Sequence, residues 1–254
     1  MFNYNLFMKR LSNHKSSNES FIKNEMAKRL LKRLDFIKLN PTNIFVLGYF
    51  DNAYIDLLKA RFPNADIQTT DNGEDTFDIV ISNSTIHLTD SINDELDDYY
   101  DMLSDDGILL FSTFGDKNFN NIKSIFDQID SLPHTNGMVD AKTWAGILQS
   151  SQYKVPAMES DIFTLTYENI NTLFIDIREL NEPLADTKMK DSFTGKRLWN
   201  KFTDKLEQEL KLNIEALYAY AVKKKETTNK SINNNSNRMS LDDLKQQIAD
   251  FKKN

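Results

Sequence analysis

The chain contains no cysteine, and it has only 7 glycines and 3 histidines among its 254 residues. The lack of cysteine excludes disulfide bonds, thiolate nucleophiles and cysteine-based metal sites. The histidines, His14, His87 and His134, are too scattered to indicate a metal cluster, and we expect no bound metal. Glycine makes up roughly 3% of the residues, against an average near 7%. Because a phosphate-cradling loop normally uses three glycines, this scarcity argues against one.

Long apolar runs are also missing. No stretch has the length of a membrane span, and no signal-peptide core follows Met1. The formal charge of −7 and the pI of about 5.1 do not favour binding to nucleic acid or to an anionic membrane. We therefore expect a cytoplasmic protein that binds neither. A chain of this length can form one domain with appendages and bury a substantial core.

Apolar runs alternate with segments of helical periodicity along most of the chain. The two most informative runs are residues 43–52, which break at Gly48, and residues 77–83, which end at Asn83. A strand, a glycine turn, a helix and further strands are typical of an open parallel sheet whose ligands lie beyond the carboxyl ends of the strands. The sequence therefore predicts an α/β fold of the Rossmann-like type, an open and mostly parallel sheet flanked by helices.

The predicted elements follow from this alternation. Strands are expected at 44–47, 66–70, 77–83, 108–114, 153–160 and 214–222. Helices are expected at 20–37, 53–62, 93–103, 118–132, 141–149, 169–180 and 198–210, and a loop at 181–195. In the first helix the apolar residues share one face, and the lysines and arginines of the opposite face predict a solvated surface.

The predicted organisation has four parts. Residues 1–40 form an N-terminal helical segment, and residues 41–222 form the sheet domain with a small lid near 130–200. Residues 223–239 are charged and rich in asparagine, as in a flexible linker. Residues 240–254 begin with Ser240-Leu-Asp-Asp243, which resembles a capping box, and continue as an amphipathic helix. That helix either docks on its own body or mediates self-association or contact with a partner.

Short segments spread over residues 6–222 carry a family resemblance. They are Leu6-Phe-Met-Lys-Arg10, Glu25-Met-Ala-Lys-Arg-Leu30, residues 77–83 with His87-Leu88, Asp106-Gly107-Ile-Leu-Leu-Phe-Ser-Thr113, His134-Thr-Asn136, Phe163-Thr-Leu-Thr-Tyr167, Asp176-Ile-Arg178, Phe193-Thr-Gly195-Lys196 and Glu215-Ala-Leu-Tyr218. No single segment is specific, but in this order they resemble class I S-adenosylmethionine-dependent methyltransferases. Within that class they are similar to the malonyl-acyl-carrier-protein O-methyltransferases of biotin synthesis. The methyltransferase-like assembly factors of respiratory complex I share much of the pattern.

The resemblance implies S-adenosylmethionine as cofactor, malonyl-acyl-carrier protein as partner, and methyl transfer to the malonyl carboxylate. The cofactor-binding positions would be Gly48, Asp71 and Asn83. The substrate-binding positions would be His87, His134, Arg178, Lys196, Arg197 and Tyr218. Ordinary alternatives stand beside these roles. Gly48 and Asp71 suit simple turns, His87 suits a packed position, the basic residues suit a solvated face, and Tyr218 suits the core.

The cofactor motif departs from the family pattern. Val46 stands where the first strand usually ends in an acidic residue. After Gly48, Phe50 and Asn52 replace two glycines, and Asp51 places a negative charge where the cofactor carboxylate would lie. Asp71 follows Gly48 at about the 20 residues expected of a ribose-binding carboxylate. The strand at Phe77-Asp78 then comes too soon for the family's intervening helix and strand, so we expect a shortened sheet. The alternative to an active methyltransferase is therefore a catalytically inactive binding or assembly protein that no longer binds the cofactor.

Overall fold

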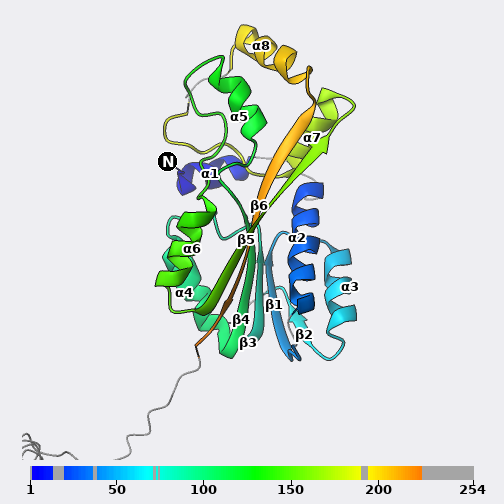
Figure 1. Cartoon of the computed structure of the whole chain (residues 1–254), viewed down its shortest axis with the longest axis vertical. Coiled ribbons are helices and arrows are strands. Elements are labelled where there is room, and N and C mark those ends of the chain that lie inside the picture. Colours follow the sequence, from blue (N-terminus) through cyan, green and yellow to red (C-terminus); the bar gives the residue numbers. More distant parts are fainter. Residues whose placement is uncertain are drawn as a thin grey trace, which may run out of the picture. The chain divides into compact units, whose positions relative to one another are not determined.

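The computed structural model describes residues 2–13, 20–36, 39–70, 73, 75–189 and 194–224 (Figure 1). The predicted C-terminal helix at 240–254 lies outside these residues, as does the predicted linker apart from Lys223 and Lys224. The proposed ribose ligand Asp71 lies outside them too. Among the described residues, no helix combines the length and the apolar character that spanning a bilayer requires.

The described residues form one sheet of six strands, in the order β2-β1-β3-β4-β6-β5. The strands are β1 (Asn43–Gly48), β2 (Asp66–Gln68), β3 (Phe77–Asn83), β4 (Leu103–Phe114), β5 (Lys154–Thr166) and β6 (Lys211–Val222). The first four pair in parallel, whereas β6 runs antiparallel to both of its neighbours. The strand order reverses beside β1, because β2 lies on one side of it and β3 on the other. This reversal is the switch point at which open α/β sheets bind ligands.

The described helices are α1 (Tyr4–Leu11), α2 (Phe21–Arg33), α3 (Asn52–Arg61), α4 (Ile92–Met102), α5 (Asn120–Asp127), α6 (Ala141–Ser150), α7 (Ile170–Glu179) and α8 (Lys196–Leu206). Helices α2 and α3 cover one face of the sheet, and α4 and α6 cover the other. Alternate strand residues explain the two layers. Ile44 and Val46 pack in one core with α2 and α3, and Phe45 packs in the other with α4 and α6. Figure 1 shows these helix pairs on opposite sides of the sheet.

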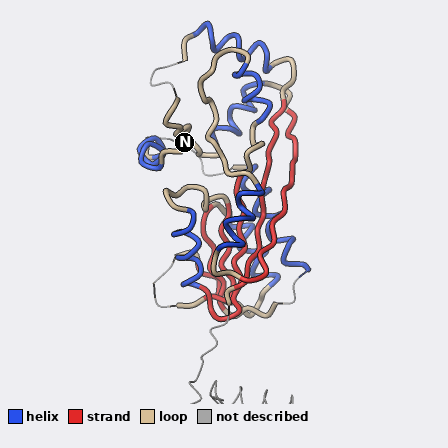
Figure 2. The backbone as a smooth tube through the Cα atoms, turned by 60° about the vertical axis from the view of Figure 1, so that its left-hand side comes forward, coloured by secondary structure: helices blue, strands red, loops and turns tan. Residues whose placement is uncertain are grey.

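The strands β5 and β6 run beyond the rest of the sheet toward α7 and α8 (Figures 1 and 2). Pairing between β4 and β6 ends at Phe114 and Ala216, whereas β5 stays paired with β6 as far as Thr166 and Lys211. The predicted strand at 153–160 was therefore too short. Its continuation alternates exposed and half-buried residues and is held by the partner strand, so no long apolar run marked it.

This arrangement is the Rossmann-like class I methyltransferase fold, and the predicted fold class is confirmed. The expected shortening is confirmed as well. Strand β2 ends at Gln68 and β3 begins at Phe77, and the described residues between them form neither helix nor strand. The connection from β2 to β3 is thus too short to hold an additional helix and strand.

Candidate functional site

Gly48 ends β1 at the switch point, where its backbone has a φ of +88°. A Cβ at this position would lie 2.3 Å from the backbone oxygen of Asn83 and 2.9 Å from Cγ2 of Thr85. The next residue, Tyr49, donates its backbone N–H to the same Asn83 oxygen at 3.0 Å. The glycine is therefore required by a close approach between β1 and the end of β3, and the chain needs it with or without a cofactor.

Asn83 is fully buried, and its side chain is engaged within the protein. Its Nδ2 donates to the carbonyl oxygens of Lys23 at 3.0 Å and Tyr49 at 2.5 Å. Its Oδ1 accepts a hydrogen bond from Oγ of Ser112 at 2.5 Å. Since both amide protons are used, the side chain ties α2, the Gly48 turn and β4 together and has no donor left for a ligand.

The amino end of α3 is the usual anion-binding position of this fold. Here Asp51 caps the helix, with its Oδ1 accepting the N–H of Tyr54 at 2.7 Å. The carboxylate of a ligand would meet this charge at close range. Phe50 beside it is half-buried and packs against the core. A cavity of about 320 Å³ remains at the switch point, lined by Phe7, Leu11, Lys23, Gly48, Tyr49, Phe50, Ser84, Thr85, Leu88 and Asn181. We call it the switch-point cavity, and its described residues do not fit S-adenosylmethionine.

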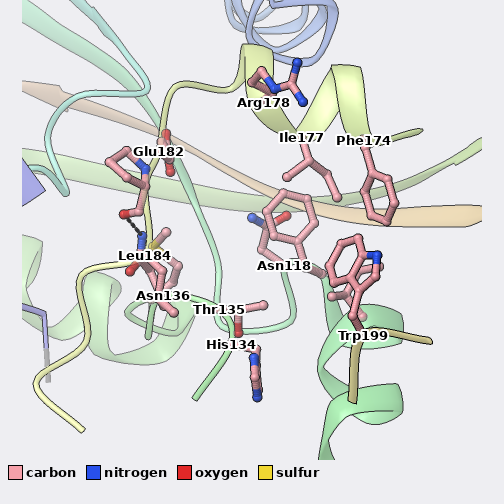
Figure 3. Close-up of a pocket in the computed structure, with 14 residues that line it drawn as sticks. Asn118, His134, Thr135, Asn136, Phe174, Ile177, Arg178, Glu182, Leu184 and Trp199 are labelled. Carbon is pink, nitrogen blue, oxygen red and sulfur yellow. Dashed lines mark hydrogen bonds between the residues drawn. The ribbon is translucent and has the colours of Figure 1, made fainter. Parts of the chain in front are cut away.

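A larger cavity of about 480 Å³ lies among α5, α7 and α8. It is lined by Asn118, Phe119, Ile122, His134, Thr135, Asn136, Met138, Phe174, Ile177, Arg178, Glu182, Pro183, Leu184 and Trp199 (Figure 3). We call it the α7–α8 cavity. Most of its wall is apolar, with a few polar groups, which is typical of a pocket for a small organic group. Among the described residues, no cluster of three or more histidine or acidic side chains is placed to hold a metal ion.

Two predicted substrate residues meet at the α7–α8 cavity. Arg178, in the last turn of α7, and His134 are both among the residues that line it. The His134 ring stacks on Phe126 with centroids 3.7 Å apart, and its Nε2 lies 2.9 Å from Oδ1 of Asp130. The ring is therefore fixed by stacking and by the neighbouring carboxylate.

The other predicted substrate residues lie elsewhere. Lys196 and Arg197 are exposed in the first turn of α8, and neither lines the cavity. They share that helix with Trp199, which does line it. Tyr218 is buried in the middle of β6, with the guanidinium of Arg33 3.6 Å from its ring centre. It lines neither cavity, and its position is that of a core residue.

His87 belongs to a buried ionic cluster that the sequence did not reveal. Lys23 Nζ lies 2.8 Å from Glu182 Oε1, and His87 Nε2 lies 3.4 Å from Glu182 Oε2. The other ring nitrogen of His87 pairs with Oγ1 of Thr113 at 3.0 Å. Burial alone would raise the pKa of Glu182, but its interactions with Lys23 and His87 outweigh burial and lower that pKa to about 2.

The prediction of a solvated basic face on the first helix was wrong for Lys23, which is 5% exposed. It was wrong in part for Arg29 and Arg33, which lie half-buried against β5 and pair with Asp161 and Glu159. Periodicity places a lysine on a face, but it does not show which other segment covers that face. The covering carboxylate, Glu182, comes from the segment predicted as a loop.

Known proteins similar to this chain in sequence share one name. No family model matches the chain. It is 23% identical to malonyl-[acyl-carrier protein] O-methyltransferase 1 of Coxiella burnetii, over 80% of this chain and 82% of the relative. The enzyme of that name from Gallionella capsiferriformans is 20% identical over 80% and 84%, and the one from Legionella pneumophila is 21% identical over 71% and 74%.

Solved structures give weaker likenesses. A putative methyltransferase from Bacillus halodurans matches with a TM-score of 0.45 and 11% identity, over 78% of this chain and 98% of that one. A phosphoethanolamine N-methyltransferase from Haemonchus contortus matches with a TM-score of 0.44 and 13% identity, over 79% and 53%. The strand order, and not these low scores, identifies the fold. The chain has the class I methyltransferase fold and resembles the malonyl-acyl-carrier-protein O-methyltransferases in sequence over most of its length.

Proposed function

We propose that this chain binds a malonyl acyl-carrier protein, the substrate in the names of its relatives, with the acyl group in the α7–α8 cavity. The observation that carries this proposal is the cavity itself. Its volume of about 480 Å³ suits an acyl thioester, and its wall is largely apolar, with Arg178 and His134 among the polar residues that line it. Helix α7 and the first turn of α8 fall within the lid predicted near residues 130–200, and α5 precedes it.

The carrier protein would dock on α8. This helix carries four cationic residues and one acidic residue, whereas the whole chain has a formal charge of −7. Lys196 and Arg197 are exposed there, and Trp199 is 41% exposed while also lining the cavity. A partner with an acidic helix would be attracted to this surface, and Trp199 would mark the entrance for its acyl arm.

Two outcomes of binding remain as candidates. Methyl transfer from S-adenosylmethionine to the malonyl carboxylate is the activity in the relatives' names, and the sequence similarity favours it. Its acceptor is already a carboxylate, so the chain would need to position the reactants more than to move protons. Binding without methyl transfer is favoured by the switch-point cavity, where Asn83 is saturated and Asp51 caps α3. The geometry supports this second outcome best, and we propose it as the function of the chain.

The test combines three measurements on the full chain. Malonyl-carrier protein should bind, and more weakly as the salt concentration rises, because docking depends on complementary charge. No methyl ester should form when S-adenosylmethionine is added. The gene should not rescue a biotin-requiring strain that lacks its own malonyl methyltransferase. Rescue would establish catalysis and overturn the second outcome. Absence of carrier binding would overturn the proposal as a whole.

A further inference from the structure

The buried cluster of Lys23, Glu182 and His87 lies where three cavities meet. Lys23 lines the switch-point cavity, and Glu182 lines the α7–α8 cavity. His87 lines a third cavity of about 370 Å³ beside the start of α4. In this fold, a donor at the switch point and an acceptor under the helices would have to meet near this cluster. The ion pair of Lys23 and Glu182 therefore lies between the switch-point cavity and the α7–α8 cavity, where the donor and the acceptor of a transfer reaction would have to come into contact.

The carboxylate of Glu182 comes from a different part of the fold than Lys23 and His87. Lys23 extends from α2, and His87 follows β3 and is fixed to Thr113 on β4. Glu182 comes from the segment after α7, and Figure 3 shows it across the cavity from Trp199. The backbone oxygens of that segment accept hydrogen bonds from other segments of the chain. Leu184 O accepts from Arg10 Nη1 at 2.5 Å, Ala185 O from Asn3 N at 2.8 Å, and Pro183 O from Asn136 Nδ2 at 3.1 Å.

We propose that Lys23 and His87 form a carboxylate-binding site, and that Glu182 occupies it as a ligand built into the chain. Two nitrogen-bearing side chains, one from each of two sheet-associated segments, converge on the two oxygens of this single carboxylate. A buried lysine is stable only with a counter-charge, so whichever carboxylate fills the site must match its charge. A small carboxylate that enters from the α7–α8 cavity supplies the same charge and geometry.

The built-in carboxylate has a consequence for binding. A ligand carboxylate must displace Glu182, so its apparent affinity equals its intrinsic affinity multiplied by the fraction of chains in which the site is open. Displacement also removes the partition between the switch-point cavity and the α7–α8 cavity. The identity of the natural ligand, the carboxylate of a malonyl group, rests on the proposed function. The carboxylate-binding site formed by Lys23 and His87 does not depend on that function, since any small carboxylate can probe it.

The experiment uses malonate as the probe and the full chain as the protein. Malonate affinity is measured by calorimetry for the wild type, for Glu182→Gln and for the double variant Glu182→Gln with Lys23→Gln. Glu182→Gln keeps the size of the side chain and removes its charge. Malonate should bind Glu182→Gln about tenfold or more tightly than the wild type, and the double variant should lose this gain. Exposed Glu168 provides the matched control, because Glu168→Gln should bind malonate as the wild type does.

Glu182→Ala adds a second readout. It leaves Lys23 without a counter-charge and makes room for a ligand, so malonate or acetate should raise its melting temperature more than chloride at equal ionic strength. The inference is overturned if Glu182→Gln gains no malonate affinity and malonate does not raise the melting temperature of Glu182→Ala more than chloride does. It is also overturned if the affinity gained by Glu182→Gln persists when Lys23 is replaced. Carrier binding by the wild type is a separate measurement. If the wild type does not bind the carrier protein while carboxylates still bind Glu182→Gln, the proposed function is wrong and the carboxylate-binding site is supported. If the wild type binds the carrier protein but Glu182→Gln does not bind carboxylates, only the carboxylate-binding site is rejected.

Discussion

Replacing Gly48 by alanine tests whether this glycine is needed for the close approach between β1 and the end of β3. The substitution puts a methyl group on a residue with φ of +88°, 2.3 Å from the backbone oxygen of Asn83. That oxygen cannot retreat cheaply, because it belongs to the end of β3 and accepts the N–H of Tyr49. The left-handed backbone costs an L-residue roughly 1–2 kcal/mol, and the forced separation of β1 from β3 adds a similar amount. We expect Gly48→Ala to lower the free energy of unfolding by roughly 2–4 kcal/mol.

Gly73 supplies the matched control. Its φ is +76°, and a Cβ placed there meets nothing within 4 Å. Gly73→Ala should therefore cost only the backbone strain, roughly 1–2 kcal/mol. In a chain of this size each kcal/mol lowers the melting temperature by about 2–4 °C, so thermal unfolding separates the two variants. If Gly48→Ala is no less stable than Gly73→Ala in the absence of any cofactor, the close approach is not the reason for the glycine and the argument fails.

Three further predictions concern the ionic cluster, the basic surface and the C-terminal segment. The pKa of Glu182 falls from an ordinary value of 4.5 to about 2 in the folded chain. The stability it contributes, roughly 3 kcal/mol, should be full above about pH 4.5 and lost as the pH falls toward 2. Urea unfolding of wild type and Glu182→Gln should thus converge as pH falls, and a constant difference would contradict this. Arg178→Ala and Arg197→Ala should each weaken carrier binding by roughly 1–3 kcal/mol, whereas Lys59→Ala on α3 should not. A titration in which all three variants lose the same affinity would contradict the proposed docking surface. Truncation after Lys225 should leave the melting temperature nearly unchanged, and an insoluble product would place residues 226–254 in the core.

The layered fold was readable from the sequence because its central strands β1, β3 and β4 contain apolar runs and its helices repeat with a 3.6-residue period. Ile44 and Val46 alternate with Phe45 between two cores, which is the pattern that a buried strand must show. The shortened route from β2 to β3 was readable from chain length alone, since a few residues cannot hold both a helix and a strand.

The candidate site was only partly readable. The resemblance pointed to His134 and Arg178, and both line the α7–α8 cavity. It did not point to Lys23 or Glu182. Their burial results from a segment after α7 folding back over α2, and no local period records a contact between residues so far apart in sequence. A lone lysine on a polar helix face has the same pattern whether water or a carboxylate covers it.

The most direct test of the account is a calorimetric titration of the full chain with S-adenosylmethionine, alone and in the presence of malonyl-carrier protein. The central claim is that the substrate side is retained while the switch-point cavity no longer takes the cofactor. We expect no saturable binding of S-adenosylmethionine, or a dissociation constant of about 1 mM or weaker, equivalent to about −4 kcal/mol. A dissociation constant in the micromolar range would contradict the claim and identify the chain as a cofactor-binding methyltransferase.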